Sequence, residues 1–197
     1  MRAHPSRKNS RLVQIDIPTS KEHSKRADAN AIEDIKVYSD GSVHGGKVSA
    51  VALLRREGKP DRFLQFHLGS TAHHTVYEAE LVGMVMGLHL IKTERRNTIK
   101  CTLNVDNQAA LTAIKLELNK SGQHLAVILL KAVKNLFESK GNNRFSLTLR
   151  WSASHVGSGG SEDADELAKS AADGKSSEKK VLPPYLRRAL GYSRSAL

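Results

Sequence analysis

The sequence predicts an α/β domain with a mixed β-sheet, in which some neighbouring strands run antiparallel and others parallel. Three strand-like runs between residues 35 and 68 follow one another through short turns, which favours an antiparallel meander. From residue 75 the apolar positions change to a helical spacing. Further strand-like runs then alternate with helical segments, and a strand–helix–strand crossover places parallel strands side by side.

The meander is expected to have three strands and two turns that contain glycine. These are strands 35–40, 47–55 and 62–68, with turns at 44–47 and 57–60. The first strand contains the β-formers Val37 and Tyr38 and runs into Asp40 and Gly41, a turn signal. Asp40 would then be held rigidly at the end of a strand. Taken alone, an ordinary hairpin turn explains an Asp-Gly pair equally well.

Helices and strands are expected to alternate through the rest of the domain. The expected ranges are helix 75–92, strand 98–105, a helix to about residue 114, helix 123–139, strand 144–151 and helix 161–172. Asp106 ends the fourth strand and takes the N-cap position of the helix that follows. The domain itself is expected to span residues 35–173.

Both ends of the chain are expected to lie outside this domain. Residues 1–34 are rich in Ser, Lys, Arg, Asn and Asp and contain only a short apolar patch at 12–15, which indicates a mostly disordered lead-in. Residues 174–197 carry six basic residues and one acidic residue, and a Pro183-Pro184 pair interrupts them. We expect this basic C-terminal tail to lie outside the core.

Composition excludes several classes of protein. The single cysteine, Cys101, rules out a disulfide framework and a cysteine-based zinc site. No apolar run approaches the ~20 residues of a membrane span, and the N-terminus lacks the apolar segment of a secretory signal, so we expect no membrane partner. The expected location is intracellular, nuclear or cytoplasmic. An Arg- and Ser-bearing N-terminus leaves a mitochondrial presequence open, although Asp16 argues against it.

The chain is strongly basic, with a formal net charge of +11 and a pI near 9.9. A basic surface around an acidic pocket suits a polyanion that is held by its phosphates and attacked at a metal site. The alternative is a basic protein that binds nucleic acid nonspecifically or not at all.

Four acidic residues stand at element ends or on helix faces: Asp40, Glu80, Asp106 and Asp165. Adjacent parallel strands end at one edge of a sheet, so Asp40 and Asp106 are expected to come close together. Converging carboxylates repel one another, and cations that prefer hard oxygen ligands, Mg²⁺ or Mn²⁺, would stabilise them. His155, in a glycine-rich loop, could assist proton transfer or product release. The alternative is four unrelated surface acids.

Five short motifs, in order along the chain, carry a resemblance to a known family. They are Tyr38-Ser39-Asp40-Gly41-Ser42, Tyr77-Glu78-Ala79-Glu80-Leu81, Val105-Asp106-Asn107-Gln108-Ala109-Ala110, Trp151-Ser152-Ala153-Ser154-His155-Val156-Gly157 and Ala164-Asp165-Glu166-Leu167-Ala168-Lys169. This series resembles the type 1 ribonuclease H domain, in the style found at the end of retrotransposon reverse transcriptases. The resemblance covers roughly residues 35–173.

The resemblance implies a ribonuclease H-like fold: a five-stranded mixed sheet whose first three strands are antiparallel, with helices on both faces. It implies an endonuclease that uses two Mg²⁺ ions, with Mn²⁺ as a possible substitute, to cut the RNA strand of an RNA–DNA hybrid. The metal-binding acids would be Asp40, Glu80, Asp106 and Asp165, with His155 as a further catalytic residue. Substrate contacts are implied at four other positions, which are Gly41, Ser42, Thr75 and Asn107.

Two of the acids have close competitors. Glu78 and Glu80 point about 200° apart on a helix, so only one can face the site. The family's acid directly precedes the Leu of a Glu-Leu pair, which selects Glu80. In the last motif, the family's acid is the first residue of an Asp-Glu-Leu-Ala run, which selects Asp165 over Asp163. The family often has Asn at the positions next to Thr75, whereas this chain has Val76 and Tyr77 there.

The resemblance leaves the grip on substrate and the biological setting open. No basic insertion of the kind used by some cellular members is evident, so affinity is expected to come from the C-terminal tail or from a polymerase domain in cis or trans. The candidate phosphate contacts are Lys169, Lys175, Lys179, Lys180, Arg187 and Arg188. The main alternative is a catalytically silent, retroelement-derived domain that binds nucleic acid or protein. A related-fold integrase or exonuclease is a further alternative.

Overall fold

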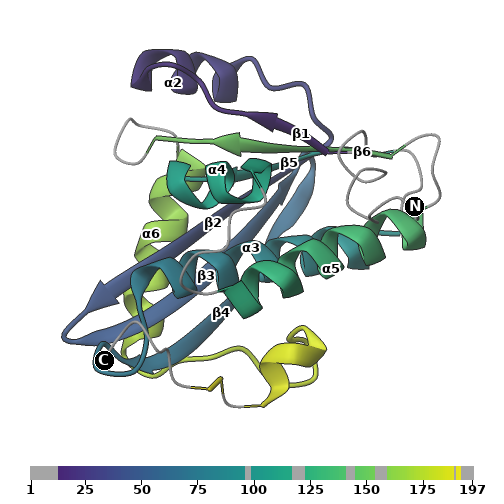
Figure 1. Ribbon diagram of the computed structural model, residues 1–197. Helices are drawn as coiled ribbons and strands as arrows, with labels where there is room; N and C mark the ends of the chain where they lie inside the picture. The colour runs from purple at the N-terminus through teal and green to yellow at the C-terminus, as the bar shows by residue number, and fades with distance from the viewer. Residues whose placement is uncertain are drawn as a thin grey trace, which may run out of the picture.

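The computed structural model of the protein describes residues 13–95, 99–116, 123–140, 145–153, 159–188 and 190–191. Six strands form one sheet in the order β1-β6-β5-β2-β3-β4 (Figure 1). The strands are β1 (Val13–Asp16), β2 (Ile35–His44), β3 (Lys47–Arg56), β4 (Lys59–Ser70), β5 (Ile99–Val105) and β6 (Phe145–Trp151). The helices are α2 (Lys21–Ala29), α3 (Val76–Thr93), α4 (Gln108–Leu116), α5 (Gln123–Lys140), α6 (Gly159–Ala172) and the 3₁₀ helix η1 (Pro184–Arg187).

The strand directions confirm the predicted mixed sheet. β2, β3 and β4 are joined as an antiparallel meander, and β5 and β6 run parallel to β2. The two-residue turn between β2 and β3 consists of Gly45 and Gly46, both with positive φ. Such a turn needs positive φ at both residues if its twist is to match that of the strands. β2 is therefore a central strand, with a parallel neighbour on one side and an antiparallel neighbour on the other.

The sheet has six strands, so the expected count of five is wrong. The sixth strand is β1, which pairs in parallel with the edge strand β6 and places Val13 opposite Leu147 and Ile15 opposite Leu149. β1 lies in the apolar patch of the N-terminal segment. Four residues with only two inward apolar side chains carry little periodic signal, which is why the sequence pattern did not reveal a strand.

The expectation of a disordered lead-in is also wrong for residues 13–34. Arg150 of β6 is mostly buried and ties the segment to the domain through Asp16 at 2.9 Å and Glu33 at 3.0 Å. The Tyr38 hydroxyl donates to Asp28 Oδ1 at 3.1 Å. Polar and ionic contacts of this kind hold the segment, and a composition that is poor in apolar residues does not reveal them.

Helices cover both faces of the sheet, as predicted (Figure 1). α3 packs on β2 and β3 and is itself covered by α5, whereas α6 packs on the opposite face of the same two strands. α3 is buried along most of its length because it lies between the sheet and α5. Gly87 lets it approach closely, since a Cβ there would lie 2.7 Å from Leu103 Cδ1. None of the described helices is long and apolar enough to cross a bilayer.

The segment after Gly174 packs on the domain, contrary to the expected tail outside the core. Ser177 N donates to the Gln65 carbonyl oxygen at 2.8 Å, and Ser176 Oγ accepts from His67 N at 2.9 Å, both on the edge strand β4. Leu182 and Leu186 then bury their side chains in the main hydrophobic core. Two leucines in a basic stretch broken by prolines show no periodicity, so the sequence pattern hid this contact.

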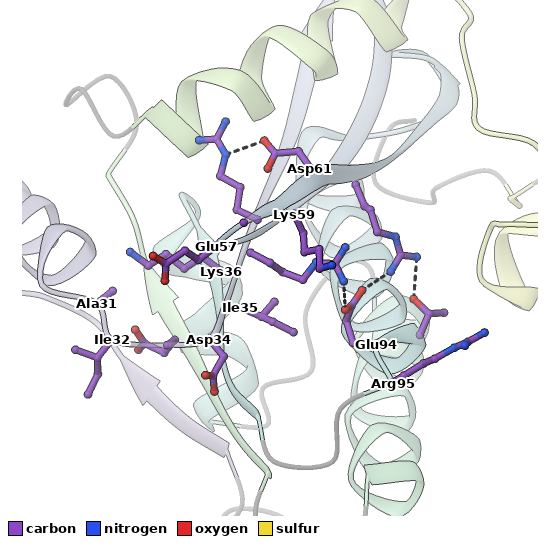
Figure 2. A pocket seen from close by; sticks show the side chains of 16 residues that line it. Ala31, Ile32, Asp34, Ile35, Lys36, Glu57, Lys59, Asp61, Glu94 and Arg95 are labelled. Atoms are coloured by element: carbon purple, nitrogen blue, oxygen red, sulfur yellow. Dashed lines mark hydrogen bonds and ion pairs between the residues drawn. The ribbon is translucent and has the colours of Figure 1, made fainter.

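A cavity of about 1100 Å³ lies at the end of the sheet where β2 begins and α3 ends (Figure 2). Several of its charged groups are paired with one another. Glu94 accepts from both Arg56 and Arg62, and Arg55 Nε donates to Asp61 at 2.9 Å. Acidic and basic side chains alternate around this cavity, so its walls favour neither an anion nor a cation.

Candidate active site

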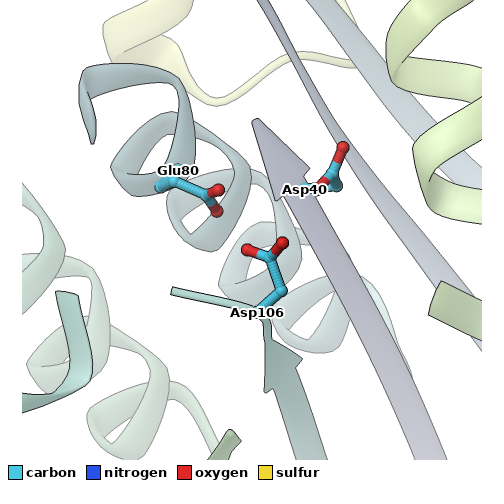
Figure 3. Close-up of side chains that lie close together, drawn as sticks. All are labelled: Asp40, Glu80 and Asp106. Atoms are coloured by element: carbon cyan, nitrogen blue, oxygen red, sulfur yellow. The ribbon is translucent and has the colours of Figure 1, made fainter. Parts of the chain in front are cut away.

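Three carboxylates meet at the opposite end of the sheet from this cavity (Figure 3). Asp40 comes from β2, Asp106 follows the last residue of β5, and Glu80 lies in the first turns of α3. One carboxylate oxygen from each lies within 4.8 Å of the others. The parallel pairing of β2 and β5, with Ser39 opposite Val105, brings the two aspartates to the same sheet edge.

β2 continues through Asp40 and Gly41 to His44, so the expected turn at the Asp-Gly pair is wrong. Gly41 serves a different purpose. A Cβ at this position would lie 2.6 Å from Glu80 N and 2.9 Å from the carbonyl carbon of Ala79, both backbone atoms that cannot move aside. Glycine therefore lets the first turn of α3 rest on β2, and this contact brings Glu80 to Asp40.

Burial and the charges of neighbouring carboxylates raise the pKa values of two of the three acids, Asp40 and Glu80. Burial, followed by the charges of Asp106 and Asp165, raises the pKa of Asp40 to about 7. Burial and the charges of Asp106 and Asp40 raise the pKa of Glu80 to about 10. Glu80 is 3% exposed, and its Oε2 has no hydrogen-bond partner among the described residues. The cluster thus concentrates negative charge that nearby protein groups only partly compensate.

The fourth predicted acid, Asp165, lies on another wall of the same cleft. This cleft, of about 190 Å³, is lined by residues of β2, β5 and α6 that include Asp40, Asp106 and Asp165. Asp165 is not among the three carboxylates whose oxygens lie within 4.8 Å of one another. Its Oδ2 accepts from Lys169 Nζ, one helical turn later, at 2.6 Å.

The two competing acids have structural roles. Glu78 completes a capping box with Thr75 at the start of α3 and lies 3.5 Å from His74 Nδ1. Asp163 pairs with Arg55 of β3. Neither is among the residues that line the cleft with Asp40.

The four expected substrate contacts divide into two pairs. Gly41 and Ser42 line the cleft beside Asp40. Thr75 and Asn107 cap helices: Thr75 Oγ1 accepts from Glu78 N at 3.2 Å, and Asn107 Oδ1 accepts from Ala110 N at 3.0 Å. The cap of α4 is therefore Asn107, and the prediction that Asp106 occupies that position is wrong.

The remaining candidates are His155 and the basic residues of the C-terminal segment. His155 lies outside the described residues, so its role stays a prediction. Among the tail cations, Arg187 donates to the carbonyl oxygens of Leu182 and Lys180, which stabilises the tail's own fold. Lys179 and Arg188 are exposed.

The sequence analysis missed several residues that line the cleft, among them Asn104, Ser161 and Glu162. Asn104 is 2% exposed, and its amide donates to the Val37 carbonyl oxygen at 3.2 Å, which links β5 to β2 beside the carboxylates. A polar amide between the apolar residues Leu103 and Val105 was the signal that could have identified it, since buried polar side chains need a specific partner.

Trp151, the first residue of the fourth motif, packs in the hydrophobic core and also forms a hydrogen bond. It is 9% exposed, and its indole Nε1 donates to the Asp106 carbonyl oxygen at 2.8 Å. The end of β6 therefore fixes the backbone of a cluster residue.

No protein-family model matches the sequence, and a search of curated proteins found no match. Solved structures do match. LC9-RNase H1, described as a type 1 RNase H with the type 2 active-site motif, is 18% identical over 72% of this chain and 73% of its own, with a TM-score of 0.54. LC11-RNase H1 in complex with an RNA/DNA hybrid is 13% identical over 71% of this chain and 97% of its own, also with a TM-score of 0.54.

The N-terminal RNase H domain of rv2228c from Mycobacterium tuberculosis is 16% identical and matches 71% of this chain and 98% of its own, with a TM-score of 0.52. Identities this low establish the architecture alone. Together with the strand order and the helices on both faces, they show that the chain has the ribonuclease H-like α/β fold.

Proposed function

We propose that the protein is a divalent-metal-dependent endonuclease that hydrolyses the RNA strand of RNA–DNA hybrids. The observation that carries the proposal is the convergence of Asp40, Glu80 and Asp106 at one edge of a ribonuclease H-like sheet. Structures of type 1 RNase H proteins share the fold, and one of them, LC11-RNase H1, is in complex with an RNA/DNA hybrid. Because the motifs resemble those of retrotransposon reverse transcriptases, we propose that the domain originates from a retrotransposon.

The residues present fit a hard divalent cation. All three side chains offer carboxylate oxygens, the ligand type that Mg²⁺ and Mn²⁺ prefer. Glu80 Oε2 is buried without a partner among the described residues, which is costly unless a cation or a donor approaches it. Burial and, after it, the charges of neighbouring carboxylates raise the pKa values of Asp40 and Glu80, and a bound cation would offset both effects.

Each acid has a proposed place in the reaction. Two divalent ions bound by these acids would supply an activated water and stabilise the leaving oxygen. Asp40 and Asp106 would hold both ions, Glu80 one of them, and Asp165, across the cleft, the other. His155 is proposed to assist proton transfer or product release. Contacts to the 2′-hydroxyl in the minor groove would give the preference for RNA.

Basic groups are proposed to hold the hybrid by its phosphates. Lys179 and Arg188 in the C-terminal segment are exposed, and the chain carries a net charge of +11. Thr75 accepts a bond as a helix cap, but a hydroxyl that accepts one bond is still able to donate another to a phosphate. A reverse transcriptase polymerase domain in cis or in trans would add affinity.

A panel of labelled duplexes tests this proposal. With Mg²⁺, and with Mn²⁺ as a second condition, the purified chain should cut the RNA strand of an RNA–DNA hybrid and leave double-stranded DNA, double-stranded RNA and single-stranded RNA largely intact. Preferential cleavage of DNA would favour an integrase- or exonuclease-like activity and would contradict the proposal, as would the absence of any cleavage with either metal.

One observation favours a second candidate, a catalytically silent domain that binds nucleic acid or protein. Lys169 neutralises Asp165, so the fourth acid already has a cation within the protein. Isothermal titration calorimetry with Mg²⁺ distinguishes the two. The enzyme should show specific, saturable metal binding that Asp40→Asn removes, whereas a silent domain should show no specific binding in either protein.

A further inference from the structure

The N-terminal helix α2 reaches the candidate active site through one buried side chain. Ser24 is 1% exposed. Its Oγ donates to the Trp151 carbonyl oxygen at 3.1 Å and accepts from Ala153 N at 2.9 Å. A single hydroxyl therefore fixes two backbone groups at the point where the chain leaves β6, although Ser24 is more than a hundred residues away in sequence.

The chain segment that Ser24 holds forms hydrogen bonds with Val105 and Asp106. Trp151 lies opposite Val105 in the parallel pair of β5 and β6, and Ser152 N donates to the Val105 carbonyl oxygen at 2.9 Å. The Trp151 indole then donates to the Asp106 carbonyl oxygen. A continuous set of hydrogen bonds thus runs from α2 through residues 151–153 to the main chain of Asp106.

The contacts that dock the N-terminal segment do not depend on Ser24. Arg150 holds Asp16 of β1 and Glu33, and Lys36 Nζ donates to the Asp28 carbonyl oxygen at 3.2 Å. Removing the Ser24 hydroxyl should therefore leave α2 in place. It would release only the backbone of residues 151–153, whose buried N–H and C=O groups would lose their partner.

We propose that Ser24 is a positioning residue for the carboxylate of Asp106, acting through the Trp151–Ala153 backbone and the Trp151 indole. This inference rests on the proposed function, because it concerns how the metal-binding carboxylates are held. Residues that orient a metal ligand from outside the site are often as necessary as the ligands themselves, because ligand geometry sets metal affinity. Through this one side chain, helix α2 would then support the candidate active site.

The test compares Ser24→Ala with the parent in hybrid cleavage and in Mg²⁺ binding. We expect kcat to fall by about 10-fold or more and Mg²⁺ to bind correspondingly more weakly, with KM for the hybrid within about twofold, since Ser24 touches no substrate surface. Asp16→Ala is the matched control, because it removes a contact of the same segment with Arg150 and leaves residues 151–153 untouched. Its kcat and Mg²⁺ affinity should match the parent.

Trp151→Phe provides a second route to the same carboxylate. Phenylalanine keeps an aromatic ring but lacks the Nε1 donor to Asp106, so kcat and Mg²⁺ affinity should fall as in Ser24→Ala. Because both side chains act on one residue, the double variant should lose less than the product of the two single losses. Independent, multiplicative losses would contradict the proposal, as would a Ser24→Ala variant that matches Asp16→Ala.

Failure of this inference differs from failure of the proposed function. A parent that cleaves hybrids while Ser24→Ala retains full kcat and Mg²⁺ affinity overturns the positioning role alone. A parent that binds Mg²⁺ without cleaving still decides the question through the affinity of the variant. A parent that neither cleaves nor binds the metal overturns both, because Asp106 would then have no metal site to complete.

Discussion

Asp40 and Glu80 combine features that destabilise a folded protein unless something else binds to them. Each is a carboxyl group held away from water and close to other acids, and the pKa of each is raised. Gly41 of β2 faces the backbone of α3, and a larger residue there would push Glu80 away from Asp40. The backbone is thus shaped to bring the acids together, which is expected of a ligand-binding site and works against stability in the free protein.

The raised pKa values predict how stability depends on pH in metal-free protein. The pKa of Asp40 rises from 3.8 to about 7, so between these values the folded state holds a proton that the unfolded state has released. Stability therefore falls as the pH rises through this window. Asp40→Asn removes this dependence. At neutral pH it should increase the free energy of unfolding by at least about 1 kcal/mol, since a tenfold change in ionisation corresponds to about 1.4 kcal/mol.

Urea denaturation in a metal chelator, over the range from about pH 4 to about pH 7, measures this effect. Other groups titrate in the same range, so the informative quantity is the difference in slope between the parent and Asp40→Asn. Saturating Mg²⁺ should then stabilise the parent and leave the variant unchanged. Equal slopes, or an Asp40→Asn variant that is less stable than the parent in chelator, would contradict this account of the cluster.

Much of the cluster could be predicted from local patterns, because Asp106 follows the end of a strand and Glu80 lies in the first turns of a helix that the sequence marks. Asp40 was predicted at a strand end, although β2 continues to His44. The choice of Glu80 over Glu78 rested on the resemblance, and the structure gives the physical difference: Glu78 is used in the helix cap. The hydrogen-bond partners of Asn104 and of the Trp151 indole could not be predicted, because each partner lies more than forty residues away in sequence.

The terminal segments, at the next level of organisation, are where the sequence patterns were misleading. Residues 13–34 looked like a disordered lead-in and the residues after Gly174 like a tail, yet one adds β1 and α2 and the other covers the edge of β4. Covering an edge strand blocks pairing with other chains. Both segments dock mainly through side-chain hydrogen bonds, ion pairs and isolated leucines, and none of these produces a periodic pattern.

The docking of the C-terminal segment can be tested by a pair of neighbouring substitutions. Leu182 is 1% exposed and Val181 is 43% exposed. Leu182→Ala leaves a cavity in the core and should lower the free energy of unfolding by about 2–4 kcal/mol, whereas Val181→Ala should change it by less than about 0.5 kcal/mol. Denaturant unfolding of both variants measures this. Equal effects would show that the segment does not form part of the core.

The arrangement of the whole sheet followed from the sequence because two general rules constrain it. Short glycine turns require the antiparallel meander, and crossover helices require β5 and β6 to lie parallel to β2. The parallel pairing of β2 and β5 ends with Ser39 opposite Val105, which is how the next residues, Asp40 and Asp106, become neighbours. The sixth strand lies outside these rules, because β1 joins the far edge through a separate segment of chain.

The molecule as a whole has a ribonuclease H-like fold, and we propose that this scaffold carries a metal-dependent nuclease site. The rate of cleavage of the labelled RNA strand of a hybrid, measured for the parent and for Asp106→Asn in Mg²⁺, tests this description. Asp163→Asn, which alters an acid paired with Arg55, is the matched control. Thermal unfolding should show that all three proteins remain folded.

We expect the parent and Asp163→Asn to cleave at similar rates. Asp106→Asn should be slower by at least about 100-fold, because charge stabilisation by a bound metal is worth several kcal/mol and each ~1.4 kcal/mol is tenfold in rate. Cleavage that persists in Asp106→Asn at the parental rate would contradict the assignment of the site, and a parent that leaves the RNA strand intact would contradict the proposed function.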